Sequence, residues 1–160
     1  MSTDLATIGN MFKANTSLFE KATREIPAER WLVQPGEDSN HLLWIAGHVV
    51  VSRGSAVKTL GGEWSAPWEK LFARGAQRAA AQEYPEPAEI QQAWQEVSEK
   101  LVAALPKASK EMLETPVAKG QPSLDGTVGG IIAFLCLHET YHMGQMGYVR
   151  KCLGYGQVVG

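Results

Sequence analysis

The chain has 160 residues, of which 44% are hydrophobic and 20% are charged. This length and composition exclude a disordered chain and predict one domain, over residues 1–160, with a hydrophobic core. The 15 basic and 17 acidic side chains give a net charge of −2. Because proteins that bind nucleic acid or anionic membranes usually have a basic excess, we expect neither among the partners of this chain.

Two further features predict a cytoplasmic location. No apolar stretch reaches the ~18 residues that span a bilayer, and the first residues lack the basic and apolar segments of a signal peptide. The two cysteines, Cys136 and Cys152, are too few for a disulfide framework, which agrees with a reducing compartment.

The positions of the prolines divide the chain into helical windows. Proline interrupts a helix interior, and the eight prolines leave four proline-free windows at 1–26, 36–66, 88–105 and 123–160. In each window apolar residues recur at steps of three and four, which is typical of an amphipathic helix and not of a strand. The second helix is expected to begin at Ser39, a good N-cap residue, and to end near Gly61. The last helix carries one stripe, formed by Val128, Ile131, Leu135, His138, His142, Gln145, Val149 and Cys152.

These windows predict an all-α fold, a four-helix bundle. Residues 61–87 join the second helix to the third, a longer link than the ~2–8 residues that usually connect antiparallel neighbours. We therefore expect a crossover between two parallel helices, folded in part into a short helix over one end of the bundle.

The last helix carries two histidines one turn apart. His138 and His142 share a helix face within the apolar stripe, where two buried imidazoles need polar partners, and at this spacing they can hold one divalent metal ion. His48, in the middle of the second helix, is either a third ligand or a hydrogen-bonded core residue. His41 lies about 10 Å away from His48 along the helix axis, so we expect it to be a hydrogen-bonded residue outside the site.

Two other metal motifs fit the sequence poorly. His138, Glu139 and His142 match the H-E-x-x-H pattern of zinc proteases. That site needs a third ligand, usually downstream, but the 18 residues after His142 contain no His, Asp or Glu, and Tyr148 occupies the position of the third histidine in the extended motif. Ferritin-like di-iron sites need two Glu-x-x-His units, and this chain has one.

Two segments resemble a known family. The segment NHLLWIAGH at 40–48 resembles the second-helix signature of the DinB/YfiT-like superfamily, and HETYHMGQ at 138–145 resembles its last-helix signature. The resemblance implies a bundle with the helix order up-down-down-up and the crossover between helices 2 and 3. It also implies a homodimer and one divalent metal ion, zinc or nickel, held by His48, His138 and His142. Some relatives transfer or use low-molecular-weight thiols, which makes such a thiol an expected co-substrate.

An open metal site gives several neighbouring residues a possible role. Three protein ligands leave one position free on a tetrahedral metal ion, where a bound water or thiol is activated. Glu139 is then a candidate catalytic general base or a structural glutamate. Gln145 is a candidate to orient a ligand or is a polar residue at the bundle end. The aromatic candidates to line the site, which could equally be core residues, are Trp44, Trp64, Trp68, Tyr141 and Tyr148.

The sequence leaves two function classes open. The first is a metal-dependent transferase or hydrolase that acts on a small molecule, for example a thiol S-transferase. The second is a non-catalytic metal- or ligand-binding bundle involved in the stress response. In either case we expect a homodimer, because the first two helices carry apolar residues outside a single stripe, such as Met11, Leu18 and Val51.

Overall fold

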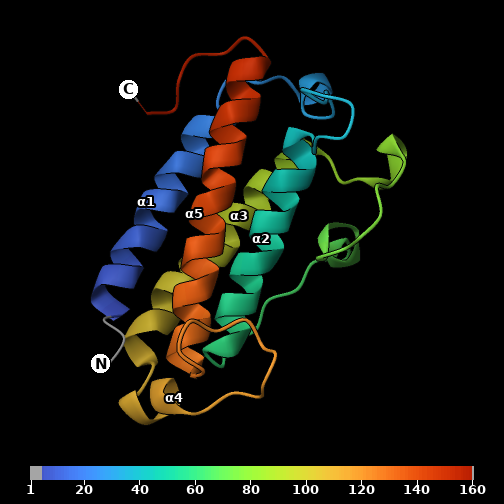
Figure 1. Ribbon diagram of the computed structural model, residues 1–160. Helices are drawn as coiled ribbons and strands as arrows, with labels where there is room; N and C mark the ends of the chain where they lie inside the picture. Colours follow the sequence, from blue (N-terminus) through green and yellow to red (C-terminus); the bar gives the residue numbers. More distant parts are fainter. Residues whose placement is uncertain (1–4, 160) are drawn as a thin grey trace.

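The structure, a computed structural model, describes residues 5–159. Within this range four long helices form a bundle: α1 (Leu5–Thr23), α2 (Leu42–Thr59), α3 (Pro87–Ala104) and α5 (Val128–Cys152). α1 and α5 run in one direction and α2 and α3 in the other (Figure 1), so the predicted up-down-down-up bundle is confirmed. The described residues contain no β-strand, only an isolated bridge between Pro116 and Thr127. Residues 1–4 and 160, which the predicted domain includes, lie outside this description.

The N-terminus of α2 differs from the prediction. The cap is His41, whose Nδ1 accepts a hydrogen bond from the backbone N–H of Trp44 at 3.1 Å. Ser39, the expected cap, instead exchanges two hydrogen bonds with the backbone of Gly36 in the preceding turn. An imidazole nitrogen can accept the same helix-terminal bond as a hydroxyl, and the serine is already engaged in the turn.

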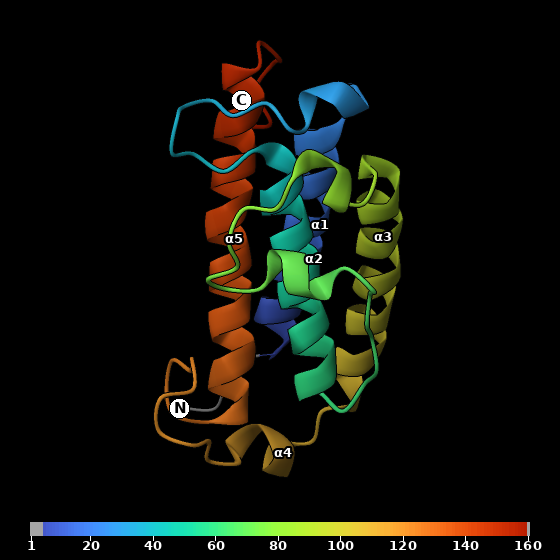
Figure 2. The same cartoon turned by 90° about the vertical axis from the view of Figure 1, so that its right-hand side faces the viewer.

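The crossover between α2 and α3 also differs from the prediction. It contains two short 3-10 helices, η2 (Glu69–Phe72) and η3 (Ala81–Glu83), and it passes along the flank of α2 (Figure 2). The expected short helix over one bundle end was therefore wrong for this link. A Cβ atom at Gly54 would lie 2.2 Å from the ring of Trp64, and one at Gly47 would lie 2.4 Å from the ring of Phe72. The two glycines let crossover rings rest directly on the α2 backbone.

The other long connection contributes the element at the bundle end. It contains η4 (Leu105–Lys107) and α4 (Lys110–Glu114), and α4 lies beneath the start of α5 (Figures 1 and 2). Thr127 then caps α5, because its hydroxyl accepts a hydrogen bond from the N–H of Gly130 at 3.0 Å.

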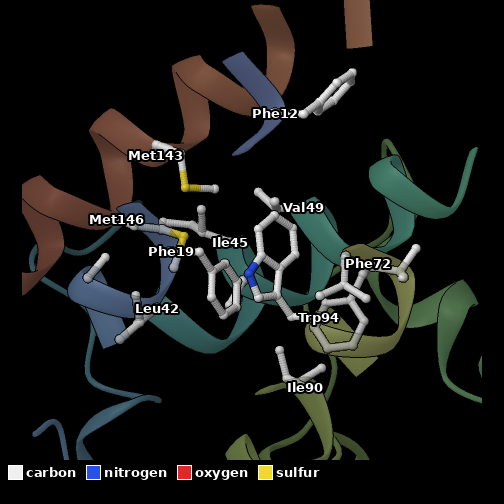
Figure 3. Packing of buried hydrophobic residues seen from close by; sticks show 14 of the residues in the cluster. Phe12, Phe19, Leu42, Ile45, Val49, Phe72, Ile90, Trp94, Met143 and Met146 are labelled. Atoms are coloured by element: carbon white, nitrogen blue, oxygen red, sulfur yellow. The ribbon is translucent and has the colours of Figure 1, made fainter. Parts of the chain in front are cut away.

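The core joins side chains from all four long helices. Phe19 of α1 stacks on Trp94 of α3 with ring centroids 4.3 Å apart, and Met143 and Met146 of α5 pack toward them (Figure 3). Full burial of one such side chain contributes about 1.5–3 kcal/mol before the entropy cost of ordering it. None of the helices among residues 5–159 is both long enough and apolar enough to cross a membrane.

The close approach at Gly47 yields a prediction. Gly47→Ala should lower the free energy of unfolding by about 1–3 kcal/mol, because the methyl group must displace the fully buried ring of Phe72. The control is Gly144→Ala in α5, where nothing lies within 4 Å of the new Cβ. That variant should be neutral or slightly stabilising, because alanine favours a helix. Denaturant unfolding curves that gave equal stability for both variants would contradict the packing described here.

Candidate metal centre

Three histidine side chains meet between α2 and α5. Nε2 of His138 lies 3.2 Å from Nε2 of His48 and 3.0 Å from Nε2 of His142. One ring nitrogen from each of the three residues lies within 4.8 Å of the others. The spacing of one helical turn places His138 and His142 on the same side of α5, and the neighbouring α2 brings His48 opposite them. The structure thus brings together the three histidines proposed as ligands from the sequence.

The outer ring nitrogens of two histidines are fixed by acceptors. Nδ1 of His48 donates to the backbone carbonyl of Phe72 at 2.7 Å, and Nδ1 of His142 donates to Oε1 of Gln145 at 2.6 Å. A neutral imidazole that donates through Nδ1 has its lone pair on Nε2. Gln145 therefore orients a candidate ligand, which is one of the two roles expected for it.

The arrangement fits a divalent cation. Two Nε2 lone pairs directed at one shared space repel each other unless a proton or a cation lies between them. Nδ1 of His138 is buried and has no hydrogen-bond partner among residues 5–159. No hydrogen bond from Nδ1 to these residues therefore determines which ring nitrogen of His138 carries the proton. Tetrahedral zinc with bonds of ~2.0–2.1 Å would separate two ligand nitrogens by about 3.3 Å, close to the separations of 3.2 and 3.0 Å between the Nε2 atoms.

Burial keeps the three imidazoles neutral. It lowers the pKa of His48, His142 and His138, and it brings the pKa of His138 to about 4 with help from the neighbouring histidines and the positive charge of Arg74. Imidazoles with lowered pKa values have free lone pairs at neutral pH, as metal ligation requires. The side chain of Arg74 is exposed, and it lies in the crossover two residues after Phe72.

Each imidazole has an aromatic neighbour. Trp44 stacks on His48 at 4.9 Å between ring centroids, and Phe134 stacks on His138 at 6.0 Å. Tyr141 meets His142 edge-on at 5.3 Å. Of the five aromatic residues considered from the sequence, Trp44 and Tyr141 thus contact the cluster. Trp68 contacts the ring of Phe72 and not an imidazole of the cluster. Trp64 is buried against α2, and Tyr148 is largely exposed.

Glu139 lies in the bundle interior and not with the three histidines. Its side chain is 1% exposed, and its two carboxylate oxygens accept hydrogen bonds from Nε and Nη2 of Arg53 at 2.8 and 2.5 Å. Burial raises the pKa of this carboxyl group, and the Arg53 guanidinium opposes the rise. The general-base role expected for Glu139 disagrees with this placement, because the residue follows His138 by about 100° around the helix and turns toward the core. The structural alternative agrees with it.

His41 and the two cysteines lie outside the cluster. His41 is buried at the start of α2, where it caps the helix and contacts the ring of Tyr84 edge-on. Cys136 is buried beside α1, and burial raises the pKa of its thiol to about 12, so it stays protonated. Cys152 is exposed at the end of α5.

Two contacts were not predicted from the sequence. The first is the ion pair between Arg53 and Glu139, which are 86 positions apart in the chain. The carbonyl of Phe72 has no sequence signature, because every residue carries one. A signal for the contact does exist in Gly47, which precedes His48 and leaves room for the Phe72 ring.

A family comparison agrees with this geometry. The family model of the DinB superfamily matches residues 11–146, which include the three clustered histidines. The match covers well over half of the chain, and the chain belongs to the DinB superfamily. None of the curated proteins matches it.

The buried ion pair yields a stability prediction. Glu139→Gln should lower the free energy of unfolding by about 3–5 kcal/mol, because it leaves the Arg53 charge buried without its counterion. The control is Glu114→Gln, which removes one carboxylate of an exposed pair with Lys110 and should change stability little. Urea unfolding measures the stability of both variants. Equal losses would show that the Glu139 carboxylate does not stabilise the buried Arg53 charge.

His41 yields a prediction about acid stability. Burial, aided by the charge of Arg78, lowers its pKa from 6.5 to about 4. Between these values the unfolded chain binds a proton that the folded chain does not, so stability falls as the pH drops below 6.5. This residue alone should account for a loss of about 2 kcal/mol between pH 7 and pH 5.

The test is His41→Asn, which keeps a good N-cap residue and removes the titrating ring. Unfolding is followed at pH 7 and pH 5 in the presence of a chelator, so that the clustered histidines contribute equally to both proteins. The variant should lose less stability on acidification than the wild type. Equal losses of stability in the variant and the wild type would show that groups other than His41 cause the acid sensitivity.

Proposed function

We propose that this protein binds one divalent metal ion through Nε2 of His48, His138 and His142. The observation that carries the proposal is the convergence of the three ring nitrogens. In His48 and His142 the Nδ1 atom donates a hydrogen bond to Phe72 or Gln145, which leaves the lone pair on Nε2. Imidazole ligands suit zinc and nickel, the two metals that we propose. Acceptors that bind the outer ring nitrogen of a ligand histidine typically hold its ring in place.

We propose that the site acts on a small molecule as a metal-dependent enzyme. A metal ion held by three ligands keeps a position open, where it lowers the pKa of a bound water or thiol. The three ligands are neutral, and the positive charge of Arg74 reaches His138, so the site favours an anionic ligand such as a thiolate or a carboxylate. The aromatic rings beside the imidazoles supply apolar contacts. Transfer of a low-molecular-weight thiol to an electrophile is the activity most consistent with these features.

One observation supports the non-catalytic alternative. Among the described residues the histidine cluster contains no carboxylate, and Glu139 is bonded to Arg53 in the interior. A site without a general base suits a metal- or ligand-binding bundle of the stress response as well as it suits an enzyme.

The proposed assembly is a homodimer in the cytoplasm. Met11 is 40% exposed and Leu18 and Val51 are half-buried, so these side chains remain available to a second copy. The two free cysteines suit a reducing compartment.

The ligand set is tested by single alanine variants. His48→Ala, His138→Ala and His142→Ala should each lose most of the bound metal, and the control His41→Ala should keep it. Elemental analysis of the purified proteins measures metal content, and a stoichiometric ion in the His48 variant would contradict the proposal. The metal-loaded wild type is then assayed with biological thiols and electrophiles. Turnover that a chelator abolishes supports the enzyme, and its absence across both panels supports the binding protein.

A further inference from the structure

One guanidinium group connects the four long helices. Arg53 belongs to α2, is 1% exposed, and donates to groups on α1, α3 and α5. Its contacts are the carbonyl of Phe12 at 3.1 Å, Thr16 Oγ1 at 2.8 Å, Ser98 Oγ at 2.5 Å, the ring of Trp94 at 3.6 Å to the centroid, and both oxygens of Glu139.

The two charged residues neighbour the histidines in sequence. Arg53 follows His48 by five residues, about 7.5 Å along α2. Glu139 lies between His138 and His142 on α5. The helices that carry the candidate ligands are therefore joined, on the interior side, by an ion pair with two hydrogen bonds close to the histidine cluster.

We propose that the Arg53–Glu139 pair is a positioning device that sets the register and rotation of α5 against α2, so that the three Nε2 atoms converge. This inference rests on the proposed metal-binding function. A forked guanidinium–carboxylate pair has two parallel bonds of fixed direction. A shift of α5 by one residue moves each side chain about 1.5 Å along the axis and about 100° around it, which breaks both bonds.

Apolar packing alone defines this register weakly. α2 buries apolar residues on more than one side, including the neighbouring pairs Leu42–Leu43 and Val49–Val50. α5 contributes Met143 and Met146 to the same core, and the flexible side chain of methionine adapts to alternative packings. Cores of this kind tolerate alternative packings with little change in stability. A buried ion pair, in contrast, adds little stability over apolar residues of similar size, so its value here lies in selecting one arrangement.

The decisive variant replaces both charges with apolar side chains, Arg53→Met together with Glu139→Leu. Such replacements of a buried pair are often neutral or stabilising, so the double variant should fold. Its affinity for Co²⁺, measured by competition with a chelator and by the visible spectrum of the bound ion, should fall by about tenfold or more, as for lost supports of metal ligands. Circular dichroism and thermal unfolding confirm that each protein is folded at the temperature of the measurement.

A second variant and a matched control complete the design. Arg53→Lys keeps a positive charge beside Glu139 but lacks the planar fork, and it should lower Co²⁺ affinity by about threefold or more. Arg150→Lys changes the other buried arginine, which binds the carbonyls of Arg24 and Gly156 beyond the cluster, and it should leave the affinity within about twofold.

The outcomes separate the two proposals. A wild-type chain that binds no Co²⁺ would overturn the proposed function and this inference together. A folded double variant with wild-type affinity would overturn this inference alone. If the double variant does not fold, Arg53→Lys decides: wild-type affinity in that variant overturns the inference, and weakened affinity with the control unchanged supports it.

Discussion

Polar groups buried between α2 and α5 must find partners, and much of this structure follows from that constraint. Residues 138–142 of α5 point to several sides of the helix within little more than one turn. Glu139 meets Arg53 in the interior, and Thr140 meets Asn15 of α1 at 3.0 Å. His138 and His142 face His48 on the side of α2 that carries the crossover. These polar contacts therefore join α5 to α2 at two places, the ion pair and the histidines, and to α1 through Asn15.

The crossover supplies a hydrogen-bond acceptor at the site that the four long helices do not supply. A bundle of four helices alone would leave Nδ1 of His48 on its flank without an acceptor. The carbonyl of Phe72 provides one, and the absent side chain of Gly47 lets the Phe72 ring lie close enough for that contact. The long link between parallel helices thus has a structural purpose at the site as well as a topological one.

The sequence predicted the features that depend on periodicity and spacing. The proline-free windows predicted the four helices, and the one-turn spacing of His138 and His142 predicted their shared face. Features that depend on tertiary contacts were predicted less well. Ser39 has the ordinary chemistry of a cap, yet its hydroxyl is used in a turn with Gly36 and His41 caps α2 instead. The course of the crossover depended on glycines that make no interaction of their own and so give no apolar pattern to follow.

Glu139 shows why a short motif does not determine a mechanism. The H-E-x-x-H pattern places its glutamate beside the metal as a general base in zinc proteases, but here a facing arginine draws the same residue into the core. The interior of the bundle therefore takes the charge that the motif would otherwise offer to a substrate. Negative charge at the candidate metal centre must then come from the bound molecule, and Arg74 and Phe72, which act on the histidines from outside, both belong to the crossover. For the proposed metal site, the helices therefore supply the three histidine side chains, whereas the crossover supplies the acceptor for Nδ1 of His48 and the positive charge of Arg74 that acts on His138.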